Sequence, residues 1–178
     1  KVGTDQVGRP HAPGRSVREF LRSLPDILAA RSFREAVSAV AAAARDRKVV
    51  AVGMGGHPVK VGLSPILIDL MKRGVIRALA MNGSGIVHDF ELAFAGRTSE
   101  DVDASIDEGE FGMAEETGRI LNEAIAEGAR AGLGIGEAVG QRIIQDGLPH
   151  AEMSLLAAGV RLGVPVTVAD VTYLPLRG

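Results

Sequence analysis

Three short apolar runs separated by helical patterns constrain the fold of this chain more than any other feature of its sequence. The runs cover residues 48–54 (KVVAVGM), 75–81 (VIRALAM) and 164–168 (VPVTV). Apolar runs of this length and composition are typical of buried strands. Because helical patterns lie between successive runs, we expect the strands to pair in parallel through right-handed crossovers. The sequence therefore predicts an α/β fold, with a three-layer parallel sheet flanked by helices in the Rossmann-like manner.

Capping patterns mark the beginnings of several predicted helices. Ser16 with Glu19, and Ser32 with Glu35, form S-x-x-E capping boxes, in which a hydroxyl and a carboxylate satisfy amides of the first helical turn. A short helix is also predicted to begin at Thr98. The other predicted helices cover residues 17–30, with a break near Pro25, and residues 33–45, 64–73, 112–131, 136–145 and 154–162.

Composition limits the class of protein. Residues 1–15 hold three Gly and two Pro and are predicted to be an extended arm, whereas residues 16–178 are predicted to be a single α/β domain. A formal charge of −2 lacks the basic surplus of a nucleic-acid binder. No apolar run approaches the roughly 18 residues that cross a bilayer. We expect a cytoplasmic protein that binds neither nucleic acid nor membranes.

A glycine-rich loop, GGHPVKVG at residues 55–62, follows the first predicted strand. Ligands of parallel sheets bind just beyond the carboxyl ends of the strands. Gly55 and Gly56 allow a close backbone approach, and the start of the next helix favours an anion. The loop departs from the dinucleotide fingerprint, because Pro58 stands where a glycine is required. The loop is equally compatible with a tight strand-to-helix turn that binds nothing. Lys60 in this loop either pairs with a phosphate, forms an imine or is simply solvated.

The loop after the second predicted strand, residues 82–91 (NGSGIVHDFE), carries the stronger signal. Its first four residues read as a flexible polar turn. His88 is a candidate for proton transfer, since imidazole titrates near neutral pH, and Asp89 is the carboxylate expected to orient it. Helix capping is the alternative role for Asp89 and Glu91. His57, His88 and these carboxylates lack a diagnostic metal spacing, so no metal is expected.

The segment of residues 53–102, which contains both loops, resembles the bacterial branch of the deoxyhypusine synthase family. The resemblance rests on the motifs GMGGHPVKVG and MNGSGIVHDFE, and it extends from FLRSLPDILAA near Phe20 to RLGVPVTV. The resemblance implies that the chain is the amino-terminal part of an NAD-binding domain. It also implies that the two loops correspond to TSN-x-x-x-S-G and TTAGG-x-EED of the eukaryotic enzymes.

This correspondence assigns roles to individual residues. Val87 and His88 take the places of the acidic pair that holds the polyamine, and Asp89 matches the aspartate that follows. A polycationic polyamine needs carboxylates around its ammonium groups, so a substrate other than or beyond spermidine is implied. The implied cofactor contacts are Gly55, Gly56, His57, Gly62, Asn82, Gly83, Ser84 and Gly85.

The function implied by the resemblance is NAD-dependent dehydrogenation of an amine, with aminoalkyl transfer through an imine. His88 would act as general base, with Asp89 and Lys60 as the other catalytic candidates. The chain ends soon after residues 164–168 and lacks the lysine-bearing carboxy-terminal part of the family. It is therefore expected to be a fragment or a shortened relative, or to have lost residues between Val168 and its terminal segment. A non-catalytic nucleotide-binding or scaffolding subunit is the first alternative, and a metal-assisted hydrolase is the second. Family enzymes build active sites between subunits, which implies a homo-oligomer, either dimer or tetramer.

Overall fold

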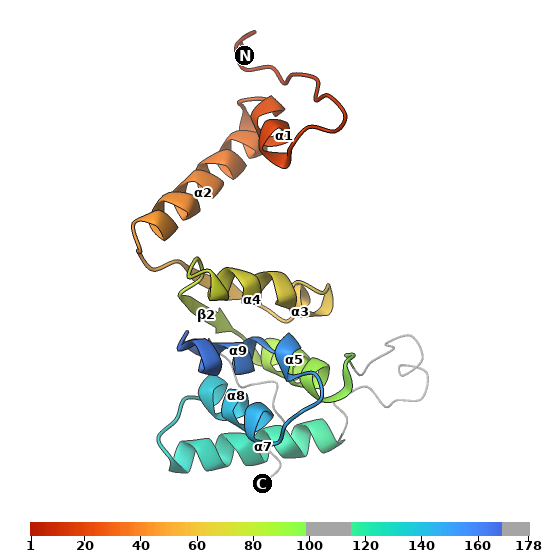
Figure 1. Ribbon diagram of the computed structural model, residues 1–178, viewed down its shortest axis with the longest axis vertical. Coiled ribbons are helices and arrows are strands. Elements are labelled where there is room, and N and C mark those ends of the chain that lie inside the picture. Colours follow the sequence, from red (N-terminus) through yellow and green to blue (C-terminus); the bar gives the residue numbers. More distant parts are fainter. Residues whose placement is uncertain (99–114, 169–178) are drawn as a thin grey trace. The chain divides into compact units, whose positions relative to one another are not determined.

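The computed structural model describes residues 1–98 and 115–168 (Figure 1). The chain divides into two compact units, residues 1–48 and residues 49–178. The predicted extended arm belongs to the first unit, together with two helices. The helix predicted to begin at Thr98 lies outside the described residues.

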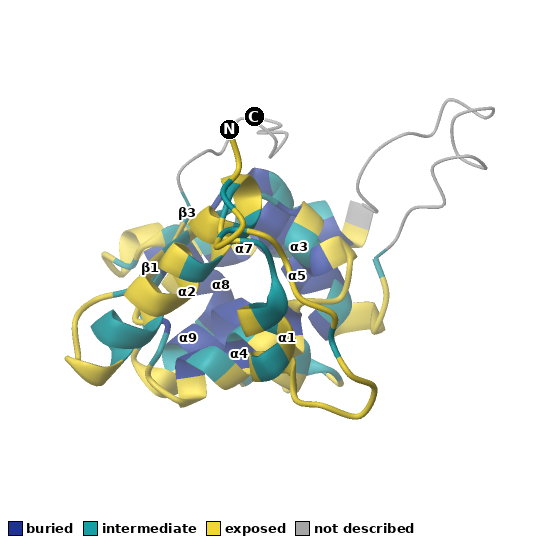
Figure 2. Ribbon diagram, turned by 90° about the horizontal axis from the view of Figure 1, so that it is seen from above, coloured by how far each residue is buried: buried dark blue, intermediate teal, exposed yellow. Residues whose placement is uncertain are grey.

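The first unit contains helix α1 (Val17–Ser23) and helix α2 (Leu28–Arg45). The capping box of Ser16 and Glu19 is confirmed, with both of its hydrogen bonds formed, and the predicted break near Pro25 separates the helices. The second capping box is not used, because α2 begins upstream of it. Neither helix has a buried residue, and Figure 2 shows both as exposed or intermediate.

The second unit is built on a three-stranded parallel sheet in the order β1-β2-β3. Its strands are β1 (Ala51–Met54), β2 (Ala78–Met81) and β3 (Val166–Val168). All three predicted strands are confirmed, although each begins two or three residues later than the apolar run. The second unit therefore has an α/β fold in which a parallel sheet is flanked by helices.

The two faces of the sheet differ in the size of their side chains. Residues that are paired in register project to the same face, and side chains alternate along each strand. The face in the hydrophobic core carries Val52, Met54, Leu79, Met81, Val166 and Val168. The opposite face carries Ala51, Gly53, Ala78, Ala80 and Thr167, which are exposed or intermediate.

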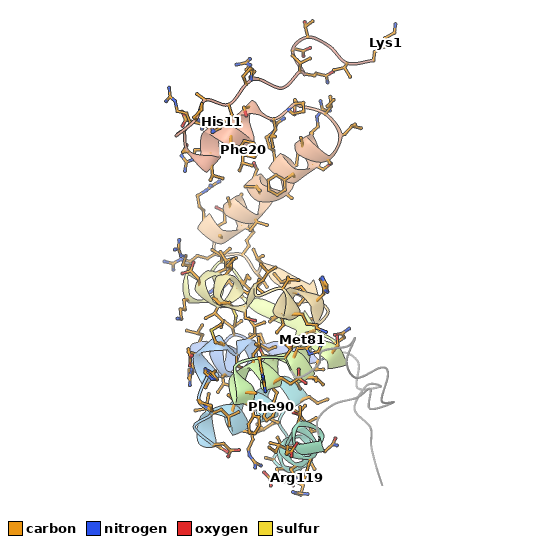
Figure 3. All side chains as sticks on the ribbon, turned by 90° about the vertical axis from the view of Figure 1, so that its right-hand side faces the viewer. Lys1, His11, Phe20, Met81, Phe90 and Arg119 are labelled. Carbon is orange, nitrogen blue, oxygen red and sulfur yellow. The ribbon has the colours of Figure 1, made fainter. Side chains whose placement is uncertain are left out.

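Helices of the second unit supply the rest of the core. They are α3 (His57–Lys60), α4 (Ser64–Lys72), α5 (Gly83–Ala95), α7 (Glu115–Arg130), α8 (Ile135–Gln145), the 3-10 turn η1 (Ala151–Met153) and α9 (Leu155–Leu162). Among the described residues, Phe90 of α5 has the largest fully buried side chain. It shares the core with Met81 of β2, and Figure 3 labels both. Gly163 ends α9 in the left-handed conformation at φ 64°, directly after the predicted end of this helix at residue 162. None of the helices in the described ranges combines the length and apolarity that a bilayer crossing requires.

Candidate functional site

The carboxyl ends of β1 and β2 lie side by side, and this brings the two glycine-containing loops together. Met54 and Met81, the last residues of these strands, are paired in register. Just beyond them, the backbone amide of Gly56 donates a hydrogen bond of 3.1 Å to the hydroxyl of Ser84. Short helix α3 also packs against α5. The two loops therefore form one continuous edge, as the parallel arrangement predicts.

Residues 82–85 are not the flexible turn that their composition suggests. Asn82 is the N-cap of α5, and its Oδ1 accepts hydrogen bonds from the Gly85 amide at 3.1 Å and the Ser84 hydroxyl at 2.8 Å. Residues 83–85 are the first turn of the helix. A side chain at Gly85 would begin only 3.0 Å from the Cβ of Met81, so glycine lets the helix pack closely on β2 without a shift of Met81.

Gly56 has a similar steric role in the loop after β1. It is buried, and a Cβ atom built on it would lie 2.7 Å from Ser84 Oγ and 2.9 Å from His88 Cδ2. Real Cβ atoms do not come this close to other heavy atoms, so a side chain at this position would displace the loop or the imidazole. Glycine at position 56 is thus explained by the close approach of the loop to α5.

The imidazole of His88 is paired with Glu91. His88 Nδ1 lies 2.9 Å from Glu91 Oε2, and the two residues stand three positions apart on α5. The Glu91 side chain is 4% exposed and the His88 side chain 18% exposed, so the pair is largely removed from water. A histidine that is hydrogen-bonded to a carboxylate and still reaches the surface is suited to proton transfer. The sequence indicates helix capping as the alternative role for Glu91, and the contact with His88 is not predicted from it.

The structure corrects the predicted role of Asp89, which does not orient His88. Its carboxylate is fully buried and accepts hydrogen bonds from the Ser154 hydroxyl at 2.6 Å and from the amides of Leu155 at 2.7 Å and Leu156 at 3.2 Å. Consecutive residues of a helix point about 100° apart, whereas residues three apart share a face. His88 therefore faces Glu91, while Asp89 faces the beginning of α9.

Burial has a marked effect on the acidity of Asp89. Loss of water around the carboxylate raises the pKa of Asp89 to about 6, and hydrogen bonds from Ser154, Leu155 and Leu156 oppose that rise. Desolvation disfavours the charged form, whereas donors stabilise it. At neutral pH the carboxylate is therefore ionised but held close to its titration range.

The remaining predicted site residues differ in their accessibility. His57 and Lys60 are exposed on α3, and exposed Gly62 follows that helix with φ 81°. Gly55, Asn82 and Ser84 are partly exposed, whereas Gly56, Gly83 and Gly85 are buried. Val87 is only 7% exposed and lies in the hydrophobic core, so it does not occupy a substrate-facing position.

No group of three or more metal-ligating side chains occurs in the part of the chain that the structure describes. Both oxygens of Asp89 already accept hydrogen bonds from the α9 end, so this carboxylate is turned away from His88 and Glu91.

Compared with known proteins, the sequence matches no family model and no curated protein. The chemistry at the carboxyl edge of the sheet therefore carries the functional argument.

Proposed function

We propose that this chain is a deoxyhypusine synthase-like domain that binds NAD at the carboxyl edge of its sheet and oxidises an amine to an imine. The observation that supports this most directly is the His88–Glu91 pair beside the junction of Gly56 and Ser84. A proton-accepting histidine and two adjoining glycine-containing loops stand at the edge where parallel sheets bind their ligands. The family resemblance of residues 53–102 supports the same assignment.

The accessible residues at this edge fit a nucleotide cofactor. The first turn of α5 presents partly exposed Asn82 and Ser84 at a helix N-terminus, where the helix dipole favours a phosphate. Gly55, His57 and Gly62 are the accessible members of the first loop, and a Cβ atom built on Gly62 meets nothing within 4 Å. We propose that these five residues hold NAD. Gly56, Gly83 and Gly85 are buried and support the loops from within.

The chemistry assigned to the chain's own residues begins with a proton. His88 removes it from the ammonium group of the substrate and leaves a lone pair on the amine nitrogen. When bound, NAD supplies the acceptor for the hydride that leaves the neighbouring carbon. A carbon–nitrogen double bond then forms in the substrate. An acceptor amine or water adds to the imine carbon, and the original carbon–nitrogen bond breaks to release the original nitrogen as ammonia or an amine. His88 retains the proton, and Lys60 is the proposed residue for phosphate pairing or for imine formation with the product.

Substrate choice follows from the residues beside His88. Val87 has an apolar side chain, and both carboxylate oxygens of Asp89 accept hydrogen bonds from the start of α9, so neither residue can hold a second ammonium group. A polyamine is polycationic and is held well only by several carboxylates. We therefore propose an amine substrate other than or beyond spermidine.

Calorimetric titration with NAD tests the binding proposal, for which we expect a dissociation constant in the micromolar range. Failure to bind NAD would reject the enzyme and also the non-catalytic nucleotide-binding subunit. The catalytic proposal is tested by NADH formation on a panel of monoamines and polyamines, which His88→Ala should abolish. His11→Ala, in the first unit, is the matched control. If His88→Ala still forms NADH, His88 has no role in the mechanism. If the wild type binds NAD but forms no NADH with any amine, the non-catalytic scaffolding subunit is favoured.

We also propose that the chain forms a homo-oligomer, dimer or tetramer, as the family resemblance implies. Helix α2 supports this, because Phe33, Val37 and Val40 recur at helical spacing and are exposed. An apolar stripe on a helix normally packs against another surface. Sedimentation velocity should show a species larger than the monomer, and Val37→Glu should reduce it.

A further inference from the structure

We propose that Glu91 is the positioning residue of this site and that it fixes the tautomer of His88, so that Nε2 is the atom that exchanges protons with a ligand. The catalytic meaning of this assignment rests on the proposed function, whereas the tautomer itself does not. The geometry behind it is the 2.9 Å separation of His88 Nδ1 and Glu91 Oε2 within helix α5. Asp89, the neighbouring carboxylate, is already bonded to α9 and cannot take this role.

The chemistry of the two groups determines where the proton lies. An ionised carboxylate only accepts hydrogen bonds, so the nitrogen that faces it must carry a hydrogen. A neutral imidazole has one protonated and one bare nitrogen. With Nδ1–H donating to Glu91, the lone pair of His88 is therefore on Nε2. If Glu91 were instead protonated and donated to Nδ1, the hydrogen of the neutral ring would be on Nε2. Nε2 would then be a hydrogen-bond donor and could not accept a proton from a ligand.

The orientation of the ring places that lone pair at the carboxyl edge of the sheet. His88 Cδ2, the carbon bonded to Nε2, is the ring atom that a Cβ atom on Gly56 would approach to 2.9 Å. The ring thus spans from Glu91 on one side to the Gly56 turn on the other. Because Nε2 is bonded to Cδ2, it belongs to the side of the ring next to the loop after β1, where the proposed function puts the ligand.

Burial makes this arrangement well suited to holding one tautomer. The Glu91 side chain is only 4% exposed, and hydrogen bonds to a charged group are stronger in a low-dielectric environment than in water. His88 also comes from the same helix as Glu91, so the backbone fixes their separation. Removing the carboxylate would free the ring to adopt either tautomer.

Long-range proton–nitrogen NMR correlation of the ¹⁵N-labelled protein, without ligands, reads this tautomer directly. In the wild type we expect neutral His88 to be protonated on Nδ1. Glu91→Gln should retain that tautomer, because its amide oxygen also accepts a hydrogen bond, whereas Glu91→Leu should shift the population towards Nε2–H. A wild-type signal that reports Nε2–H would overturn the proposal, even if Glu91→Leu fails to fold. An unchanged tautomer in folded Glu91→Leu would overturn it as well.

The NMR test of the tautomer and the tests of the proposed function can succeed or fail independently of each other. The tautomer is measured without NAD or amine, so its failure leaves the cofactor proposal standing, and the absence of NAD-dependent turnover leaves the tautomer standing. If turnover is found, Glu91→Leu should lower kcat by on the order of 10²-fold with little change in KM for the amine. Exposed Glu152→Leu is the matched control and should change neither the tautomer nor kcat.

Discussion

The carboxylate of Asp89 and the hydroxyl of Ser154 lie 2.6 Å apart, although 65 residues separate them in the sequence. Asp89 also accepts the amide hydrogens of Leu155 and Leu156, which open helix α9. Ser154 is the N-cap of that helix and accepts from the Ala157 amide at 3.0 Å. A side chain of α5 thus completes the cap of α9, and this buried polar junction joins the two helices.

Loss of this carboxylate should destabilise the fold. Asp89→Ala leaves the Ser154 hydroxyl and the Leu155 and Leu156 amides without their buried acceptor, and each such loss is costly. We expect the free energy of unfolding to fall by about 2–4 kcal/mol, measured by urea denaturation. Asp69→Ala, which removes an exposed ion pair with Arg73, should have little effect. Equal stability of the two variants would contradict the proposed cap.

Stability should also depend on pH through Asp89. Burial raises the pKa of Asp89 from 3.8 to about 6 in the folded protein. Because the folded state then binds the proton more tightly than the unfolded state, the stabilising contribution of the proton is complete below about pH 4 and is lost as pH rises through about 6. The wild type should lose up to about 3 kcal/mol across this window, on the scale of 1.36 kcal/mol per pKa unit.

Asp89→Asn removes the titrating group and provides the comparison. The free energy of unfolding of both proteins should be measured by urea denaturation at several pH values between about 4 and 7. Other groups titrate equally in the two proteins, so the difference between them isolates Asp89. A difference that stays constant across the window would contradict the assignment.

Gly56 should be intolerant of even one added methyl group. In Gly56→Ala, the new Cβ would stand 2.7 Å from Ser84 Oγ and 2.9 Å from His88 Cδ2, so the loop, Ser84 or the imidazole must move. We expect a loss of about 1–3 kcal/mol in unfolding free energy and a changed NMR spectrum for His88. Gly53→Ala is the matched control, because nothing lies within 4 Å of its added Cβ. Identical behaviour of the two variants would show that the close approach is absent in solution.

Asn82 offers a way to separate helix capping from cofactor binding. Asn82→Asp keeps the oxygen that accepts from Gly85 and adds a negative charge at the N-terminus of α5, where such a charge is favourable. Stability measured by thermal unfolding should therefore be retained or slightly increased. The same charge repels a phosphate, so NAD affinity measured by calorimetry should fall at least several-fold. Unchanged affinity would place the cofactor phosphates away from this helix.

The sheet could be predicted from sequence because its signals are local. Apolar β-branched runs and glycine stops identify strands without knowledge of their neighbours. The start of α2 was missed for the opposite reason. The capping box at Ser32 and Glu35 predicts a helix start there. Residues 28–31 (LAAR) are good helix formers, however, so α2 already begins at Leu28 and Ser32 lies inside it.

The candidate site was predicted in part. Adjacent parallel strands brought the two loops together, as expected from the order of the elements. Residues 82–85 have turn-forming composition, but capping by Asn82 and packing on Met81 make them the start of α5. Adjacency in the sequence predicts Asp89 as the partner of His88, whereas helical periodicity favours Glu91, three positions later.

Helix α5 places His88 at the ligand-binding edge and the very next residue, Asp89, in the joint with α9. Substitutions at Ser154 or at the start of α9 are therefore expected to affect His88, which lies more than sixty residues earlier in the sequence, through Asp89 and helix α5. For protein engineering, the practical consequence is asymmetric. Changes at the exposed positions of the loop after β1 should alter the proposed cofactor contacts with little effect on folding, whereas a change within residues 88 to 91 should alter chemistry and folding together.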